Sequence, residues 1–188
     1  MQNKNKYEII IHGRGGQGAK TTAEILVQAA VGEGKYVQAF PEFGPERSGA
    51  PIRSFVRISD EPIRTHEPVT DPDCVLVLDD TILDVVDVTP NLSDKEPLVI
   101  NSKKGKQELG KQHNFSGIII PVDASGMSLE VIGENRPNTV ILGKFAFVTE
   151  VVKIEGIVEV FRKKYESKIG KEKTDKNVEA IMKAYNTH

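Results

Sequence analysis

A glycine-rich stretch between a predicted strand and a predicted helix carries the clearest chemical signal in this chain. It runs from His12 to Thr22, HGRGGQGAKTT, with four glycines within six residues. Glycine reaches positive φ and lets another group approach the backbone closely. Where such a turn opens a helix, free N–H groups point at one place and attract anions. The candidate ligand-binding residues are therefore Gly13, Arg14, Gly15, Gly16, Gln17, Gly18 and Lys20.

Two phosphate-binding motifs compete for this stretch. Its glycines fit G-x-G-x-x-G, but that motif also needs an acidic residue near the end of the next strand, where Glu42 is the nearby candidate. The P-loop motif fails because Ala19 separates Gly18 from Lys20, which turns the lysine by about 100° around the helix. A third interpretation remains open, in which the turn only packs helix against sheet and holds no phosphate.

The segment from Pro41 to Pro51 contains three prolines and two glycines, which argues against regular structure. Long loops inside compact domains are usually functional or disordered, and this one mixes acids, a base and an aromatic residue. We expect a shaped contact loop, whose interface residues would be Glu42, Phe43, Glu46, Arg47 and Ser48. The alternative is a structural connection in which Arg47 pairs with Glu42 or Glu46.

The cysteine content excludes several kinds of site. Cys74 is the single cysteine among 188 residues, whereas an iron–sulfur cluster normally needs four thiolates. The common structural zinc sites and internal disulfides are excluded for the same reason. The four histidines are scattered, so we predict no metal site and no catalytic residue on this chain, and any redox metal would belong to a partner.

The charge and hydropathy of the chain indicate what it binds and where in the cell it is found. The net charge of −2 argues against a general nucleic-acid binder. No apolar run reaches the length of a membrane span, and the N-terminus has no apolar signal region. We therefore expect a cytoplasmic protein that binds neither membrane nor nucleic acid.

Hydrophobic periodicity predicts an α/β fold, with one domain over residues 1–188. The expected strands are 7–12, 36–40, 52–59, 74–79, 98–101 and 117–122, with 63–65 as a hairpin partner of the third. The expected helices are 19–33, a short one capped by Thr81 and reaching Val88, 103–113, 127–132, 140–152, 154–168 and 174–185. Asp79 and Asp80 are interpreted as strand-end caps, because neighbouring strand residues point to opposite faces.

Three longer motifs identify a family. HGRGGQGAKTTAEIL, GKYVQAFPEFGPERSGAPIRSFVRIS and PNTVILG strongly resemble the γ subunits of pyruvate:ferredoxin oxidoreductase and of other 2-oxoacid:ferredoxin oxidoreductases. The resemblance runs from about Tyr7 to about Val152, and the loop is most similar to that of pyruvate enzymes, with branched-chain (2-oxoisovalerate) enzymes next. It implies an open, mostly parallel, twisted, Rossmann-like sheet with helices on both faces, into which an antiparallel strand or hairpin is inserted. The C-terminal helices would begin at about residue 154.

The resemblance also implies a multisubunit enzyme with α, β and δ (ferredoxin-like) partner subunits, which delivers electrons to ferredoxin. Such enzymes use thiamine diphosphate with Mg, [4Fe–4S] clusters and coenzyme A. This chain has no G-D-G…N pattern of the thiamine–magnesium kind, so it resembles a non-redox subunit.

Our hypothesis is that the N–H groups of residues 15–18, with Arg14 and Lys20, favour polyanionic coenzyme A at a subunit interface. Two rivals remain. One is a free-standing Rossmann-type protein that binds NAD or FAD at the same turn. The other is a scaffolding subunit that contacts no ligand.

Overall fold

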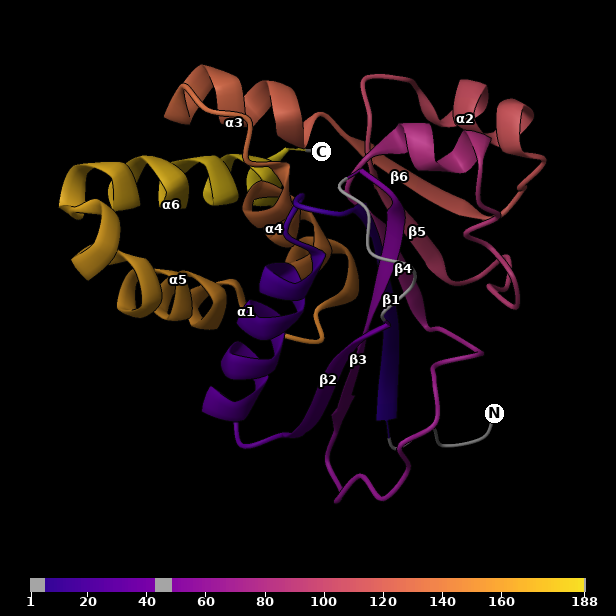
Figure 1. The fold of residues 1–188 in the computed structure, drawn as a ribbon, viewed down its shortest axis with the longest axis horizontal. Coiled ribbons are helices and arrows are strands. Elements are labelled where there is room, and N and C mark those ends of the chain that lie inside the picture. Colours follow the sequence, from indigo (N-terminus) through magenta and orange to yellow (C-terminus); the bar gives the residue numbers. More distant parts are fainter. Residues whose placement is uncertain (1–5, 43–48, 188) are drawn as a thin grey trace.

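A six-stranded sheet forms the centre of the molecule, with helices on both of its faces (Figure 1). The structure is a computed structural model and describes residues 6–42 and 49–187. The strands are β1 Lys6–Arg14, β2 Tyr36–Glu42, β3 Pro51–Ser59, β4 Cys74–Val77, β5 Pro97–Asn101 and β6 Ile118–Val122. The helices are α1 Ala19–Gly32, the short 3-10 helix η1 Asp80–Asp84, α2 Lys106–His113, α3 Ala124–Ile132, α4 Pro137–Thr149, α5 Ile154–Ile169 and α6 Lys171–Asn186.

The order of the strands in the sheet is β2-β3-β1-β4-β5-β6. Strands β1, β4, β5 and β6 are parallel, and β3 runs antiparallel to both β1 and β2. The predicted mostly parallel α/β sheet with an inserted antiparallel strand is therefore confirmed. One consequence was not predicted: β3 lies between β1 and β2, so the strand that follows α1 is not a neighbour of β1.

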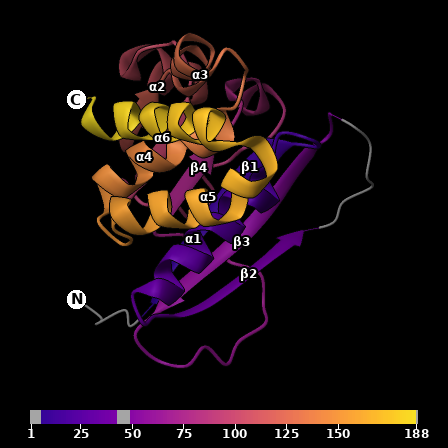
Figure 2. The same cartoon turned by 90° about the vertical axis from the view of Figure 1, so that its left-hand side faces the viewer.

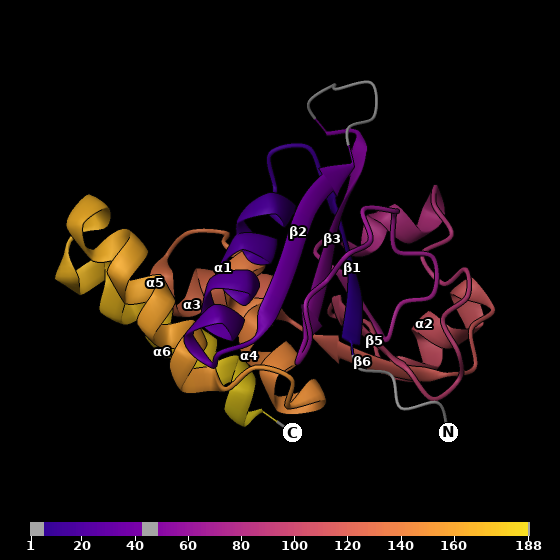
Figure 3. The same cartoon turned by 90° about the horizontal axis from the view of Figure 1, so that it is seen from below.

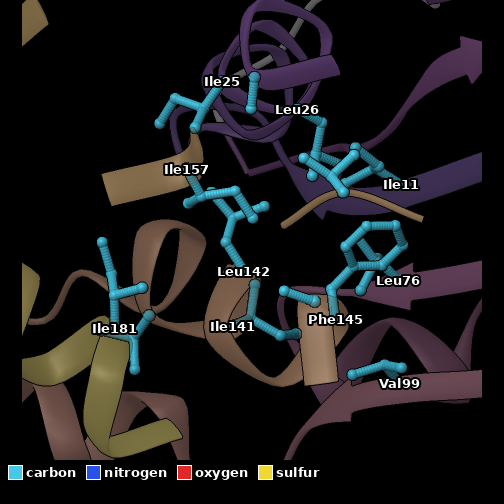
Figure 4. Packing of buried hydrophobic residues seen from close by; sticks show 14 of the residues in the cluster. Ile11, Ile25, Leu26, Leu76, Val99, Ile141, Leu142, Phe145, Ile157 and Ile181 are labelled. Carbon is cyan, nitrogen blue, oxygen red and sulfur yellow. The ribbon is translucent and has the colours of Figure 1, made fainter. Parts of the chain in front are cut away.

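Side chains of β1 alternate between two hydrophobic cores, as a buried strand requires. Ile9 and Ile11 face the larger core, which the sheet shares with α1, α4, α5 and α6. Figure 4 shows Phe145 of α4 gathered with Ile11 and Leu76 of the sheet in this core. Helices α5 and α6 are outermost on this side (Figure 2). Ile10 faces the smaller core, which η1, α2 and the connecting segments cover on the opposite side (Figure 3).

Several predicted boundaries were wrong. Residues 63–65 form no strand, because the segment carries prolines at 62, 68 and 72 and its backbone is held by side chains instead of a ladder. The short helix ends at Asp84 instead of Val88, and Asp79 caps it in place of Thr81. The helix expected at residues 140–152 begins earlier, at Pro137, since proline suits the first helical position, and it ends at Thr149.

One buried ion pair ties the antiparallel insertion together. Arg57 of β3 is 2 % exposed, and its Nε lies 2.7 Å from Glu8 Oε1 of β1. The same guanidinium donates to Gln38 Oε1 of β2 at 2.9 Å and to the carbonyl of Glu67 at 2.7 Å. A single side chain thus links three strands and the segment that follows them.

Both edge strands of the sheet contain a proline, Pro41 in β2 and Pro121 in β6. Proline has no N–H to donate and is therefore confined to sheet edges, bulges and strand starts. Among the described residues, no helix combines the length and the apolar character that crossing a bilayer requires.

Helices α4 and α6 pack most closely at Gly143. A Cβ built at this position would lie 2.0 Å from the carbonyl oxygen of Ile181 and 2.9 Å from the backbone nitrogen of Tyr185. We predict that Gly143→Ala lowers the free energy of unfolding by about 3 kcal/mol or more, because backbone atoms cannot move aside easily.

Gly156→Ala is the matched control, since Gly156 is also helical but its nearest atom is Glu33 Oε1 at an ordinary 3.5 Å. It should stabilise by up to about 1 kcal/mol through helix propensity alone. Urea unfolding of both variants measures the difference. Equal effects at the two positions would contradict the close α4–α6 contact.

Candidate functional site

The glycine turn has the backbone geometry that an anion site needs. Gly16 and Gly18 adopt φ of 92° and 87°, and Gly18 is the N-cap of α1. The N–H of Thr22 donates to the carbonyl of Gly18 at 2.9 Å, so the N–H groups of the three preceding helical residues have no intrahelical acceptor. These groups point out of the start of α1. The predicted strand–turn–helix arrangement is confirmed.

Gly13 has a packing role instead. A Cβ there would lie 3.3 Å from Leu78 Cδ1 and 3.4 Å from Ala19 Cβ. The first glycine of the motif therefore lets α1 approach the sheet closely, as the packing interpretation expects.

Arg14 clamps the turn to two neighbouring segments. Its Nη2 donates to Thr81 Oγ1 at 2.8 Å and to the Thr81 carbonyl at 3.1 Å, and its Nη1 donates to the Gly49 carbonyl at 3.1 Å. The Gly15 N–H also donates to the Ala50 carbonyl at 2.9 Å. The guanidinium is therefore held against η1 and against Gly49, which precedes β3.

Gln17 links the glycine turn to Asp79. Its Oε1 accepts from the Arg14 N–H at 2.7 Å, and its Nε2 donates to Asp79 Oδ2 at 2.6 Å. Burial pushes the pKa of Asp79 upward, but hydrogen bonds from Thr81 and Gln17 and the charge of Arg14 outweigh it and lower the pKa. Asp79 thus stays ionised and fixes both the turn and the start of η1.

Asp79 was predicted only as a cap. It caps η1, the helix for which Thr81 was the predicted cap, whereas Asp80 accepts a hydrogen bond from Ser102 Oγ at 2.6 Å. Its contact with Gln17 was missed. The sequence does not give the order of the strands. Because β4 pairs with β1 in parallel, its end lies beside the glycine turn, and this pairing could not be predicted.

A cleft of about 470 Å³ opens beside the turn. Its walls are the start of α1, the connection between α3 and α4, and the facing sides of α5 and α6. The lining residues that could bind a ligand are polar, basic or aromatic: Thr21, Asn135, Arg136, Asn138, Phe161, Tyr165, Lys173 and Asn177. None of these residues was predicted to belong to the site, although Asn138 lies within the PNTVILG motif.

Gly18 and Asn138 meet at the mouth of this cleft. A Cβ at Gly18 would lie 2.6 Å from Asn138 Nδ2, so only glycine fits here without a shift. Thr22 Oγ1 donates to the Asn138 carbonyl at 2.9 Å, which fixes α4 to α1. The carboxamide of Asn138 is thereby held beside the free N–H groups of α1.

Two cations, Arg136 and Lys173, also line the cleft. Both approach Glu134, at 2.8 Å and 3.5 Å respectively. Two positive charges facing one carboxylate leave the rim net positive, and the turn adds the positive end of a helix dipole. An anionic ligand with an aromatic or amide-bearing part fits this donor set.

The predicted site residues divide into three groups. Gly16, Gln17 and Gly18 line the cleft, whereas Gly13, Arg14, Gly15 and Lys20, also within the described residues, do not. Lys20 lies along the outside of α1, 3.9 Å from Glu24. The loop residues Phe43, Glu46, Arg47 and Ser48 lie outside the described residues.

Glu42 pairs with Arg53 across the β2–β3 ladder. The dinucleotide motif places its ribose-binding acid beside the glycine turn, at the end of the strand next to β1. Here β3 occupies that position, so Glu42 stands one strand further away and is engaged by Arg53. This geometry disfavours NAD or FAD binding in the usual manner.

The described residues do not fit a metal cluster. Cys74 is fully buried within the sheet, and burial, with a smaller contribution from Asp73, raises the pKa of its thiol. Residues 6–42 and 49–187 contain no group of three or more His, Cys, Asp or Glu side chains placed to hold a metal ion.

Comparison with known proteins places the chain in a family. The family described as pyruvate ferredoxin/flavodoxin oxidoreductase matches residues 8–187. A relative from Thermococcus kodakarensis, named pyruvate/ketoisovalerate oxidoreductases common subunit gamma, is 47 % identical over 180 residues, covering 95 % of both chains. The chain therefore belongs to the pyruvate ferredoxin/flavodoxin oxidoreductase family, as its motifs indicate.

Solved structures agree with this assignment. The crystal structure of pyruvate oxidoreductase subunit PORC from Thermotoga maritima matches with a TM-score of 0.87 and 40 % identity, over 97 % of this chain and 96 % of that one. A 2-oxoglutarate:ferredoxin oxidoreductase from Magnetococcus marinus, solved with 2-oxoglutarate, coenzyme A and succinyl-CoA bound, shares the fold alone. Its TM-score is 0.79 at 20 % identity, over 97 % of this chain and 31 % of that one.

His12, directly before the turn, makes the stability of the protein depend on pH. It is 3 % exposed, and burial together with the charge of Arg53 lowers its pKa to about 4, although Asp87 opposes the shift. The unfolded chain therefore binds a proton that the folded chain does not, and stability falls as the pH drops from about 6.5 to about 4.

We predict that His12 accounts for about 3 kcal/mol of this loss, since its pKa of about 4 lies some 2.5 units below the ordinary value. Urea unfolding between pH 4 and 7, compared with His12→Gln, measures the contribution because the carboxylates are common to both proteins. Parallel pH profiles for the two proteins would show that His12 is not buried in its neutral form.

Proposed function

We propose that this chain is the γ subunit of a multisubunit enzyme that oxidatively decarboxylates pyruvate. The products of that reaction are acetyl-coenzyme A, CO₂ and reduced ferredoxin. The observation that carries the proposal is the 47 % identity with a named gamma subunit over 95 % of both chains.

The chemistry of the chain supports a non-redox role. An iron–sulfur cluster needs several thiolates, and the single cysteine is buried with a raised thiol pKa. Thiamine diphosphate and the clusters would therefore be held by the α, β and δ subunits. The Thermococcus relative is named as a subunit common to pyruvate and ketoisovalerate enzymes, which favours a γ chain that does not select the 2-oxoacid.

The role we propose for the cleft is to hold an anionic portion of coenzyme A. Its N–H groups at the start of α1 and the Asn138 amide donate hydrogen bonds, while Arg136 and Lys173 supply positive charge. Arg14, already bound to Thr81 and Gly49, would position the turn, and Lys20 would add only to the local potential. Coenzyme A supplies the thiol that accepts the acyl group, and this chain would orient it.

The rival function, a free-standing nucleotide-binding protein, predicts a different purification. We expect the chain, isolated at native abundance, to bring with it larger subunits, thiamine diphosphate and iron. A solitary chain that binds NAD or FAD in a calorimetric titration would overturn the proposal.

The coenzyme A site can be tested in the assembled enzyme. Arg136→Gln combined with Lys173→Gln should raise the KM for coenzyme A by about tenfold, since each exposed cation near a polyanion contributes roughly 0.5–1 kcal/mol. The kcat should stay unchanged, because the change removes binding that is common to substrate and transition state.

The matched control removes the same charge from the same region. Lys171→Gln combined with Lys176→Gln changes two exposed cations of α6 that do not line the cleft. We expect less than a twofold change in KM. Equal KM values for the two double variants would mean that the cleft does not contact coenzyme A.

A further inference from the structure

The segment from residue 60 to residue 96 is far more acidic than the rest of the chain. It contains eleven acidic residues against two basic ones, Arg64 and Lys95, giving a net charge of −9 where the whole chain carries −2. The remaining residues are thus net positive. The acids are Asp60, Glu61, Glu67, Asp71, Asp73, Asp79, Asp80, Asp84, Asp87, Asp94 and Glu96.

These residues gather on one side of the molecule. Apart from β4, which lies within the sheet, the segment covers the smaller core on the face opposite α1, α5 and α6 (Figures 1 and 3). We call its surface the acidic face. Helix α2 borders it, where Gln112 donates to Asp84 Oδ1 at 3.1 Å, so the lysines of α2 mark its limit on that side.

Neutral groups, not cations, bind the exposed carboxylates near the centre of this face. Asp84 accepts from the Gln112 amide, and Asp87 accepts from the N–H and hydroxyl of Thr89 at 2.9 and 2.7 Å. The bonds from Thr89 lower the pKa of Asp87 and keep it ionised. Lys35 and Arg14 pair with Asp60 and Asp79, near the margins of the face. Among the described residues neither Asp84 nor Asp87 forms a direct ion pair, and Lys104, which donates to Gln112 Oε1 at 2.9 Å, is separated from Asp84 by that amide.

An apolar spot lies among these charges. Val85 is 65 % exposed, more than any other large hydrophobic residue that the structure describes, and Leu83 and Val86 beside it are half-buried. A cleft of about 370 Å³ adjoins them, lined also by His113. The Nε2 of His113 is buried and has no hydrogen-bond partner among the described residues. An apolar centre with a charged rim is the usual composition of a protein–protein interface.

We propose that the acidic face docks a positively charged protein surface of another subunit of the enzyme, with Val85 at the centre of the contact. The inference rests on the proposed function, since it requires that the chain works inside an assembly. A second copy of this chain is a poor occupant, because two copies of the acidic face would repel each other. Opposite charge would speed association, and the apolar centre would hold the complex once formed.

Val85→Lys tests the proposal within the co-expressed complex, because it places a cation and a polar group at the centre of the contact. Leu129→Lys is the matched control, since Leu129 of α3 is 53 % exposed and lies on the other side of the sheet. Both are surface changes, so their thermal unfolding should match that of the natural chain.

We expect Val85→Lys to weaken assembly at least tenfold, measured by sedimentation of purified γ chain titrated into the remaining subunits, while Leu129→Lys assembles normally. The association rate of the natural chain should fall by about tenfold or more between 0.05 and 0.5 M NaCl. Assembly of Val85→Lys with unchanged affinity, or a salt-independent rate, would overturn the docking proposal.

Two other outcomes distinguish a failure of the proposed function from a failure of the docking proposal. If the natural chain binds no other subunit, the proposed function itself fails. If the natural chain forms a homodimer that Val85→Lys abolishes, the acidic face binds a second copy and this proposal fails.

Discussion

The buried pair of Glu8 and Arg57 is the interaction on which the shape of this chain depends. A guanidinium that is 2 % exposed must satisfy its donors within the protein, and here it does so across β1, β2, β3 and the Glu67 carbonyl. Removing Glu8 would leave the buried guanidinium without its counter-charge, whereas Glu8 also pairs with Lys6 at 3.1 Å. The Arg57 side chain therefore links the inserted strand β3 to β1 and β2 and holds the beginning of the acidic face against the sheet.

The position of β3 changes what the glycine turn can do. In a dinucleotide-binding fold the strand after the first helix lies beside β1 and brings its acid to the ribose. Here β3 occupies that place, Glu42 is engaged by Arg53, and Arg14 holds the turn to Gly49 and Thr81. The free N–H groups of α1 remain, but they face a cleft formed by α4, α5 and α6. The local motif is thus the same as in a dinucleotide-binding fold, but its surroundings have a different shape.

Local patterns were enough to predict most elements, but not how distant segments meet. The alternation of β3 and the apolar runs of β4 and β5 identified those strands within a residue or two, because burial dictates their residue types. The lining of the cleft was missed, since Asn138, Tyr165 and Lys173 come from three separate helices and look like ordinary surface residues in the sequence. Asp79 was interpreted correctly as a cap, but its bond to Gln17 depends on the pairing of β4 with β1.

Pro41 and Pro121 affect how the edges of the sheet behave before the chain joins an assembly. Before assembly the edges of the sheet are open, and an open ladder of unpaired amides invites fibrous stacking with identical copies. The proline nitrogen in each edge strand carries no hydrogen, so it interrupts this ladder at both edges of the sheet. Edge-to-edge pairing between copies is thereby disfavoured, whereas the surfaces formed by the helices are unaffected by these two prolines.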